Sequence, residues 1–154
     1  MAADLVTDPL IIQRVLDTIP QQSPFRFIDR IVELSADHIV GEYTYKKDEF
    51  FYKGHFPNRP ITPGVILLET MAQTGVVALG IYNIIADGRD LDRISLFTDA
   101  EVDFAALVEP GETVTIRAEK VFLRREKLKS KVEMYKHDQT LAAHGVLSGM
   151  GVKI

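Results

Sequence analysis

The longest apolar stretch of the chain runs from Gly64 to Ala86, and 15 of its 23 residues are hydrophobic. They are spread around the helix instead of forming one stripe, which predicts a long helix enclosed on most sides. Pro63 followed by Gly64 marks its start, because proline fits a first turn and glycine lets backbone or ligand come close. Polar and glycine interruptions, and an uncharged part that is short for a membrane span, indicate a helix in a protein core.

Outside this helix the hydrophobic pattern takes the two-residue period of β-strands. Strands are predicted over residues 25–34, 38–45, 94–104, 112–122, 127–136 and 140–152, with turns at 35–37, 110–111 and 137–139. Charged and apolar side chains alternate over residues 127–133, so this strand has one wet face and one covered face. Sequential antiparallel hairpins around one buried helix predict an α+β fold, in which an antiparallel sheet wraps around a long central helix.

The N-terminal part of the chain predicts one short amphipathic helix. Asp8 and Pro9 form an N-cap and first-turn pair, the helix runs to about Thr18, and Pro20 follows it. The preceding residues 1–7 lack the basic start and apolar core of a signal peptide, which predicts a cytoplasmic protein.

Composition narrows the class of protein further. A length of 154 residues suits one domain over 1–154, and a net charge of −4 argues against a nucleic-acid binder. The chain has no cysteine, which excludes disulfides and thiolate chemistry. Three of the four histidines, His38, His137 and His144, lack any metal-ligand spacing, so no metal site is predicted.

Candidate chemistry gathers where the long helix begins. Glu69 is the one charged residue of the helix, and an apolar setting favours its protonated form, which can donate a proton. His55 lies just upstream, in a loop that three prolines at intervals of three keep out of helical conformation. A histidine, a neutral carboxylic acid and the free N–H groups of a helix N-terminus together suit proton removal next to a carbonyl. Gln73 lies four residues after Glu69, on the same helix face, and is the predicted supporting residue that orients Glu69.

Each of these residues is also compatible with a structural role. A lone loop histidine is commonly a hydrogen-bonded structural residue, and a buried glutamine such as Gln73 can serve as a core amide satisfied by backbone. The three aromatic residues of loop 48–53 suit the wall of an acyl channel or ordinary packing. The basic residues between Arg124 and Lys131 suit either an acidic partner or a soluble outer strand face.

The run GHFPNRPITPGVILLETMAQTG resembles the signature of the β-hydroxyacyl-(acyl-carrier-protein) dehydratases of the hotdog superfamily. Weaker similarity extends to PFRFIDRIVEL, KDEFFYKGHFP and VEPGETV, so it covers most of the chain. The resemblance implies that His55 and Glu69 form the catalytic pair, supplied by opposite subunits of a homodimer that is often tripled to a hexamer. It also implies that the backbone N–H of Gly64, together with that of Val65, polarises the thioester carbonyl. Glutamate at position 69 resembles the plain dehydratase branch, since the isomerising branch typically has aspartate there.

Two segments depart from that family's pattern. Ile19-Pro20-Gln21-Gln22 stands where the family usually has Leu-Pro-His, and residues 103–106, Asp-Phe-Ala-Ala, replace the usual basic residues before the Pro-Gly turn. These departures concern carrier-protein docking and the substrate, and they leave the catalytic set intact.

The resemblance therefore implies dehydration of a 3-hydroxyacyl group on acyl carrier protein to the trans-2-enoyl thioester, without a cofactor. The pathway implied is fatty-acid synthesis or a related lipid or polyketide route. Two alternatives remain: a thioesterase of the same fold, in which Glu69 positions water, and a non-catalytic acyl-binding module. Retention of both His55 and Glu69 argues against the second.

Overall fold

The structure, a computed structural model, describes residues 3–153. Residues 1–2, part of the leader-free stretch 1–7 expected above, and residue 154 lie outside the described residues. The assignment of 1–154 to one domain stays a prediction.

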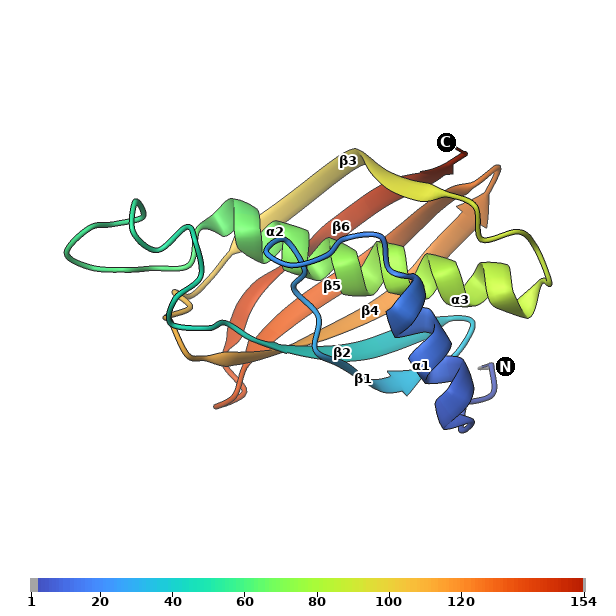
Figure 1. The fold of residues 1–154 in the computed structure, drawn as a ribbon, viewed down its shortest axis with the longest axis horizontal. Helices are drawn as coiled ribbons and strands as arrows, with labels where there is room; N and C mark the ends of the chain where they lie inside the picture. Colours follow the sequence, from blue (N-terminus) through green and yellow to red (C-terminus); the bar gives the residue numbers. More distant parts are fainter. Residues whose placement is uncertain (1–2, 154) are drawn as a thin grey trace.

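Six antiparallel strands form one curved sheet in the order β1-β2-β4-β5-β6-β3 (Figure 1). The strands are β1 (Arg30–Leu34), β2 (His38–Thr44), β3 (Ile94–Phe104), β4 (Thr113–Arg124), β5 (Lys127–Lys136) and β6 (Leu141–Val152). Burial alternates along β5 as predicted, with the apolar side chains of Leu128, Val132 and Met134 turned inward. The predicted architecture of an antiparallel sheet wrapped around a central helix is confirmed.

The central helix consists of α2 (Gly64–Ala72), a π-helical segment η1 (Gln73–Ala78) and α3 (Leu79–Ala86), and it lies across the sheet (Figure 1). Helix and sheet approach closely at Gly75, where a Cβ atom would lie 2.8 Å from Val132 Cγ2. The carbonyl oxygen of Gly75, in the π-helical segment, accepts a hydrogen bond of 2.6 Å from the buried Ser130 hydroxyl of β5. Glycine at this position therefore sets the depth at which the helix sits.

This helix is long and apolar enough to cross a membrane, but 72% of its most apolar window is buried inside the protein. It contacts the inner face of the sheet through residues such as Leu67, Met71 and Leu79, which are almost fully buried. The assignment of this helix to the protein core is therefore confirmed.

Helix α1 (Pro9–Thr18) begins and ends where the sequence predicts. The Asp8 carboxylate accepts a 2.9 Å hydrogen bond from the backbone N–H of Leu10, and Pro9 occupies the first turn. Val15 is fully buried and anchors α1 against the rest of the protein, where it packs beside β1 and α3.

The first predicted strand is wrong over residues 25–29, because β1 begins only at Arg30. The Gln73 side chain occupies the backbone groups of this segment: its Oε1 accepts from Phe27 N at 2.7 Å, and its Nε2 donates to Phe25 O at 2.9 Å. Those groups are bonded to the helix instead of to a neighbouring strand. An extended apolar pattern alone does not reveal such a partner.

The prediction of sequential hairpins is wrong at β3, which pairs with β6 and not with β4. The Pro110-Gly111 turn does form, with Gly111 at φ 88° and a bond from Glu112 N to Glu109 O of 3.2 Å. However, β5 is joined to both of its neighbours by tight turns, so β6 occupies the place beside β5. Strand β3 then pairs with the remaining edge of β6 and becomes an outer strand.

Candidate active site

A long loop between β2 and α2 projects from one end of the molecule and carries His55 (Figure 1). The backbone bonds within this loop are mostly local, such as His55 N to Phe51 O at 3.1 Å and Ile61 N to His55 O at 2.9 Å. Its return to the body is fixed by two bonds of Thr62, whose N–H donates to Val108 O at 2.9 Å and whose hydroxyl meets that of Tyr52 at 2.6 Å. The loop is thus shaped by itself and held to the body at its base.

The His55 ring is oriented by its own loop. Its Nδ1 lies 3.0 Å from the carbonyl oxygen of Ile61, and because a carbonyl only accepts, Nδ1 carries the proton. The ring also stacks on Phe56, with 4.3 Å between ring centroids. Nε2 has no hydrogen-bond partner within residues 3–153, so its lone pair is available to take a proton.

Glu69 lies on α2, half-buried, with its carboxylate held by Gln73 one turn later. Gln73 Nε2 donates to Glu69 Oε2 at 2.9 Å. Burial raises the pKa of Glu69 above its ordinary value, and the hydrogen bond from Gln73 offsets only part of that effect. The carboxyl group therefore holds its proton to a higher pH than an exposed glutamate does, as a proton donor needs.

Gln73 is itself fully buried and uses both ends of its amide. The bonds to Phe25 and Phe27 fix the amide, and its second N–H then points to Glu69. Both interpretations of Gln73 drawn from the sequence describe part of this arrangement, since it is a core amide satisfied by backbone and also a partner of Glu69.

The N-terminus of α2 offers two N–H groups. The first backbone bonds of the helix come from Ile66 and Leu67, which donate to Pro63 O at 2.9 and 3.1 Å. The N–H groups of Gly64 and Val65 have no acceptor within the described part of the chain. Val65 is 72% exposed, so this end of the helix is open to an approaching ligand. Two adjacent N–H groups at the positive end of a helix suit a developing oxyanion.

A small cavity of about 30 Å³ borders Glu69 and extends between the helix and β3. Gln21 lines it as well, and its buried Oε1 has no hydrogen-bond partner among residues 3–153. The sequence marked Gln21 only as a departure from a family pattern. The only sequence signal at Gln21 was its place beside a proline, before the first strand. That signal did not indicate that Gln21 contacts the Glu69 cavity.

One protomer does not bring the whole predicted site together. Glu69 and Gln73 are bonded, and Gly64 and Val65 begin the same helix, but within residues 3–153 His55 makes no hydrogen bond or ion pair with Glu69. No group of three or more possible metal ligands occurs among these residues. The geometry supplies an acid with an oxyanion site and, separately, a base whose accepting nitrogen is free.

Comparison with known sequences decides the family, because the FabA-like domain matches residues 19–146. The chain belongs to the FabA-like family. The 3-hydroxyacyl-(acyl-carrier-protein) dehydratase FabZ of Syntrophobacter fumaroxidans is 31% identical over 140 residues, covering 91% of this chain and 93% of that protein. The FabZ of Methylobacterium radiotolerans is 36% identical over 140 residues, covering 90% and 87%. The family relationship predicted from the sequence is confirmed.

Comparison with solved structures identifies the fold of this FabA-like chain. A chain of the dehydratase heterocomplex ApeI:P from Xenorhabdus doucetiae superposes with a TM-score of 0.76 at 14% identity, covering 90% of this chain and 91% of that chain. The structure of smu.793 from Streptococcus mutans bound to acetyl CoA gives 0.62 at 12% identity, covering 88% and 96%. At these identities the likeness shows the fold alone, and the predicted hotdog fold is confirmed.

Proposed function

We propose that this protein dehydrates 3-hydroxyacyl groups carried on acyl carrier protein to trans-2-enoyl groups, in fatty-acid or related lipid biosynthesis. The observation that carries the proposal is Glu69, a half-buried carboxyl group whose pKa is raised by burial, on a helix whose N-terminus offers free N–H groups. The curated relatives named FabZ support the same activity. The enzyme is then a hydro-lyase.

Each proposed role follows from the position of the group. The unprotonated Nε2 of His55 removes a proton from C2 of the substrate, while the thioester oxygen gains charge and accepts hydrogen bonds from Gly64 and Val65. Protonated Glu69 gives its proton to the C3 hydroxyl group, which leaves as water as the C2–C3 double bond forms. Transfer of the proton on His55 back to Glu69, through solvent, restores both groups. No cofactor takes part.

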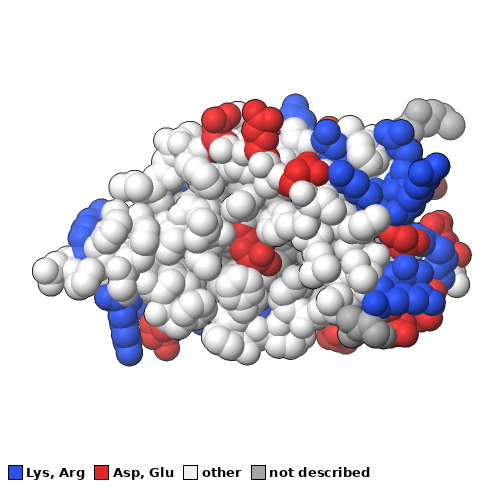
Figure 2. Space-filling view, turned by 90° about the horizontal axis from the view of Figure 1, so that it is seen from above, with Lys and Arg blue, Asp and Glu red and all other residues white. Residues whose placement is uncertain are grey.

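Because no hydrogen bond or ion pair joins His55 to Glu69 within residues 3–153, the proposal includes a homodimer in which each site takes His55 from one protomer and Glu69 from the other. Strand β3 supports this: it is an outer strand with a free edge, and large apolar side chains on it, Leu96, Phe97 and Phe104, are about half exposed. Figure 2 looks onto the β3 side of the molecule and shows a broad uncharged surface with one acidic group recessed near its centre, while other charged groups lie at its upper edge and gather at its right end. Assembly of three dimers into a hexamer stays a prediction.

The proposed partner is acyl carrier protein in the cytoplasm. Of the basic residues predicted as a docking cluster, Lys127 is paired with Asp99 at 3.0 Å, and Arg124 lies over the ring of Phe122 at 4.3 Å. These residues line the β4–β5 turn, and their contact with a carrier protein stays a prediction.

The proposal is tested with purified protein and 3-hydroxyacyl-pantetheine thioesters, by following the absorbance of the enoyl thioester. We expect turnover by the natural protein and a loss of roughly 10² to 10⁴ in kcat for His55→Ala and for Glu69→Ala. Free thiol is measured in parallel. Release of thiol without enoyl product would contradict dehydration and identify a thioesterase, and binding without either product would identify an acyl-binding module.

A further inference from the structure

A second cavity, of about 60 Å³, lies further along the central helix, between α3 and the ends of strands β3 to β6. It shares four lining residues with the cavity beside Glu69, namely Val76, Val77, Ser95 and Gly149. The two cavities therefore adjoin, and taken together, as the path below, they extend from Glu69 along the helix toward its C-terminal end.

The path has the apolar lining of a slot for an alkyl chain. From Glu69 to Ile84, which lines the far part, the helix advances by about 22 Å at 1.5 Å per residue. Gly149 faces the middle of this path, and a Cβ atom there would lie 2.6 Å from Val76 Cγ1. The side chains of Ile81, Ile84 and Leu128 make the far part apolar, so it favours a saturated tail.

Three charged side chains stand at the far end of this apolar path. They are Arg89, Arg93 and Glu126, called the end cluster below, and all three line the cavity. Arg89 Nη1 lies 2.7 Å from Glu126 Oε1, and Arg93 Nη1 lies 2.8 Å from Glu126 Oε2. Each carboxylate oxygen thus holds one guanidinium group.

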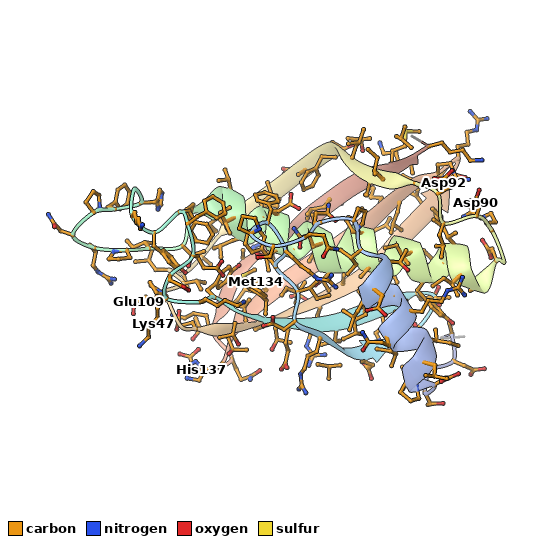
Figure 3. The ribbon with its side chains drawn as sticks, in the orientation of Figure 1. Lys47, Asp90, Asp92, Glu109, Met134 and His137 are labelled. Carbon is orange, nitrogen blue, oxygen red and sulfur yellow. The ribbon has the colours of Figure 1, made fainter. Side chains whose placement is uncertain are left out.

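Two separate segments bring the end cluster together. Arg89 and Arg93 belong to the loop from α3 to β3, and Glu126 lies in the tight turn from β4 to β5. Asp90 and Asp92 mark that loop in Figure 3, where it lies at the end of the molecule opposite the loop of His55. The ion pairs therefore join two loops across the mouth of the cavity.

We propose that the end cluster is the stop of the acyl path and sets the longest acyl tail that the protein accepts. This inference rests on the proposed dehydratase function, because that function places the thioester at Glu69 and directs the tail along the path. A tail that reaches the end cluster strips water from its charged groups and provides no hydrogen bonds in return, which costs free energy. Longer tails are accepted only if the ion pairs open.

The end cluster can be opened without touching the residues assigned to the reaction. Its side chains are only partly buried, with Arg89 33% exposed and Glu126 32% exposed, so they can turn to solvent. Glu126→Gln removes the charge that holds both arginines, and Arg89→Ala removes one wall. Glu42→Gln is the matched control, because it breaks an ion pair with Arg30 on strands β1 and β2, away from either cavity.

The test compares kcat/KM for 3-hydroxyoctanoyl and 3-hydroxypalmitoyl pantetheine. In Glu126→Gln and Arg89→Ala we expect the ratio of long-chain to medium-chain kcat/KM to rise roughly tenfold, the discrimination that about one methylene of pocket space supplies. The control variant keeps the ratio of the natural protein. An unchanged ratio in both variants, with medium-chain turnover intact, overturns the inference and leaves the dehydratase assignment standing.

A binding measurement keeps the inference testable if no dehydration occurs. S-alkyl pantetheine thioethers of graded chain length cannot react, and their Kd values are measured by calorimetry. In the natural protein we expect affinity to rise with chain length up to a limit and then fall, and in Glu126→Gln the limit moves to longer chains. The same limit in both proteins overturns the end-stop role, whereas absent enoyl product overturns only the proposed reaction.

Discussion

The two halves of the candidate site are built in opposite ways. Glu69 lies on a helix buried between sheet and loops, and a fully buried amide, Gln73, holds its carboxylate from within the same chain. His55 lies on a projecting loop whose bonds are mostly local, and its accepting nitrogen has no hydrogen-bond partner within residues 3–153. The Glu69 half has its supporting hydrogen bond within the same chain. The His55 half leaves its accepting nitrogen without a partner among residues 3–153.

In the proposed mechanism, this difference gives a reason for placing the base, His55, and the acid, Glu69, on different kinds of element. The acid needs desolvation to keep its proton, and only a core helix provides it. The base needs an unobstructed lone pair and a fixed ring, which a self-bonded loop provides through the Ile61 carbonyl and the Phe56 ring. The predictions below test each half of this contrast, beginning with the largest effect.

The largest effect is expected from mixing two inactive variants. We expect His55→Ala and Glu69→Ala each to be nearly inactive, whereas a mixed form of the proposed dimer would contain one site with an intact His55 and an intact Glu69. Mixed dimers isolated through both tags should therefore show about half of the natural kcat, because one of the two sites in each mixed dimer is intact. Activity is assayed after the two differently tagged proteins are co-purified.

A preparation of either variant alone, carried through the same procedure, is the control. No recovery in verified mixed dimers would show that His55 and Glu69 act within one chain or not together, and it would contradict the shared site.

The second effect concerns Gln73. Replacement by leucine removes three hydrogen bonds and leaves Phe27 N and Phe25 O unpaired near the core, so Gln73→Leu should lower the free energy of unfolding by about 2 to 4 kcal/mol. Urea unfolding followed by circular dichroism measures the loss. Gln13→Leu, on the exposed side of α1, is the matched control and should change stability by less than about 0.5 kcal/mol. Equal effects of the two substitutions would count against Gln73 as the fixed support of Glu69.

The third effect follows from the raised pKa of Glu69. The folded state holds this proton more tightly than the unfolded state, so the contribution to stability is greatest below the ordinary pKa of 4.5 and is lost as pH rises through the folded pKa. Glu69→Gln removes this loss while keeping an oxygen acceptor for Gln73. Thermal melts between about pH 4 and about pH 8 should show the variant gaining stability relative to the natural protein as pH rises.

Glu42→Gln, a substitution of the same type at a carboxylate that pairs with Arg30, serves for comparison. The raised pKa of Glu69 would be contradicted if the stability of Glu69→Gln relative to the natural protein did not change with pH, or if it fell as pH rises.

The smallest effect is expected at the base of the His55 loop. Arg59 pairs with Glu109 there, and both side chains are about half exposed, so Arg59→Gln should cost less than about 1 kcal/mol of stability. Hydrogen exchange should nevertheless become faster in residues 53–61 and stay unchanged in the central helix. A large loss of global stability would mean that the loop is part of the core, contrary to the contrast drawn here.

Much of the fold could be predicted because local pattern and tertiary structure agree. The apolar run of the central helix, the cap at Asp8 and the alternation along β5 each report burial directly. The strand predicted over residues 25–29 failed because its backbone is bonded to a single distant side chain, that of Gln73. The position of β3 failed because strand order depends on which edges remain free, and not on sequence neighbours.

The site was predictable in residue type but not in arrangement. A lone acid in an apolar helix and a proline-bounded histidine are visible in the sequence, and the raised pKa of Glu69 agrees with the expectation drawn from its apolar setting, while the roles of both residues stay predictions. The contact of Gln21 with the Glu69 cavity and the cluster of Arg89, Arg93 and Glu126 join residues far apart in sequence, and no spacing rule links them.

The free margin of β3 also makes turnover a matter of mass action. If a second copy pairs with the outer edge of β3, as in the proposed dimer, dilution below the dissociation constant separates His55 of one chain from Glu69 of the other. The specific activity per chain should then fall when the enzyme is diluted and recover when the enzyme is concentrated again. Assays run at different enzyme concentrations would therefore give different specific activities.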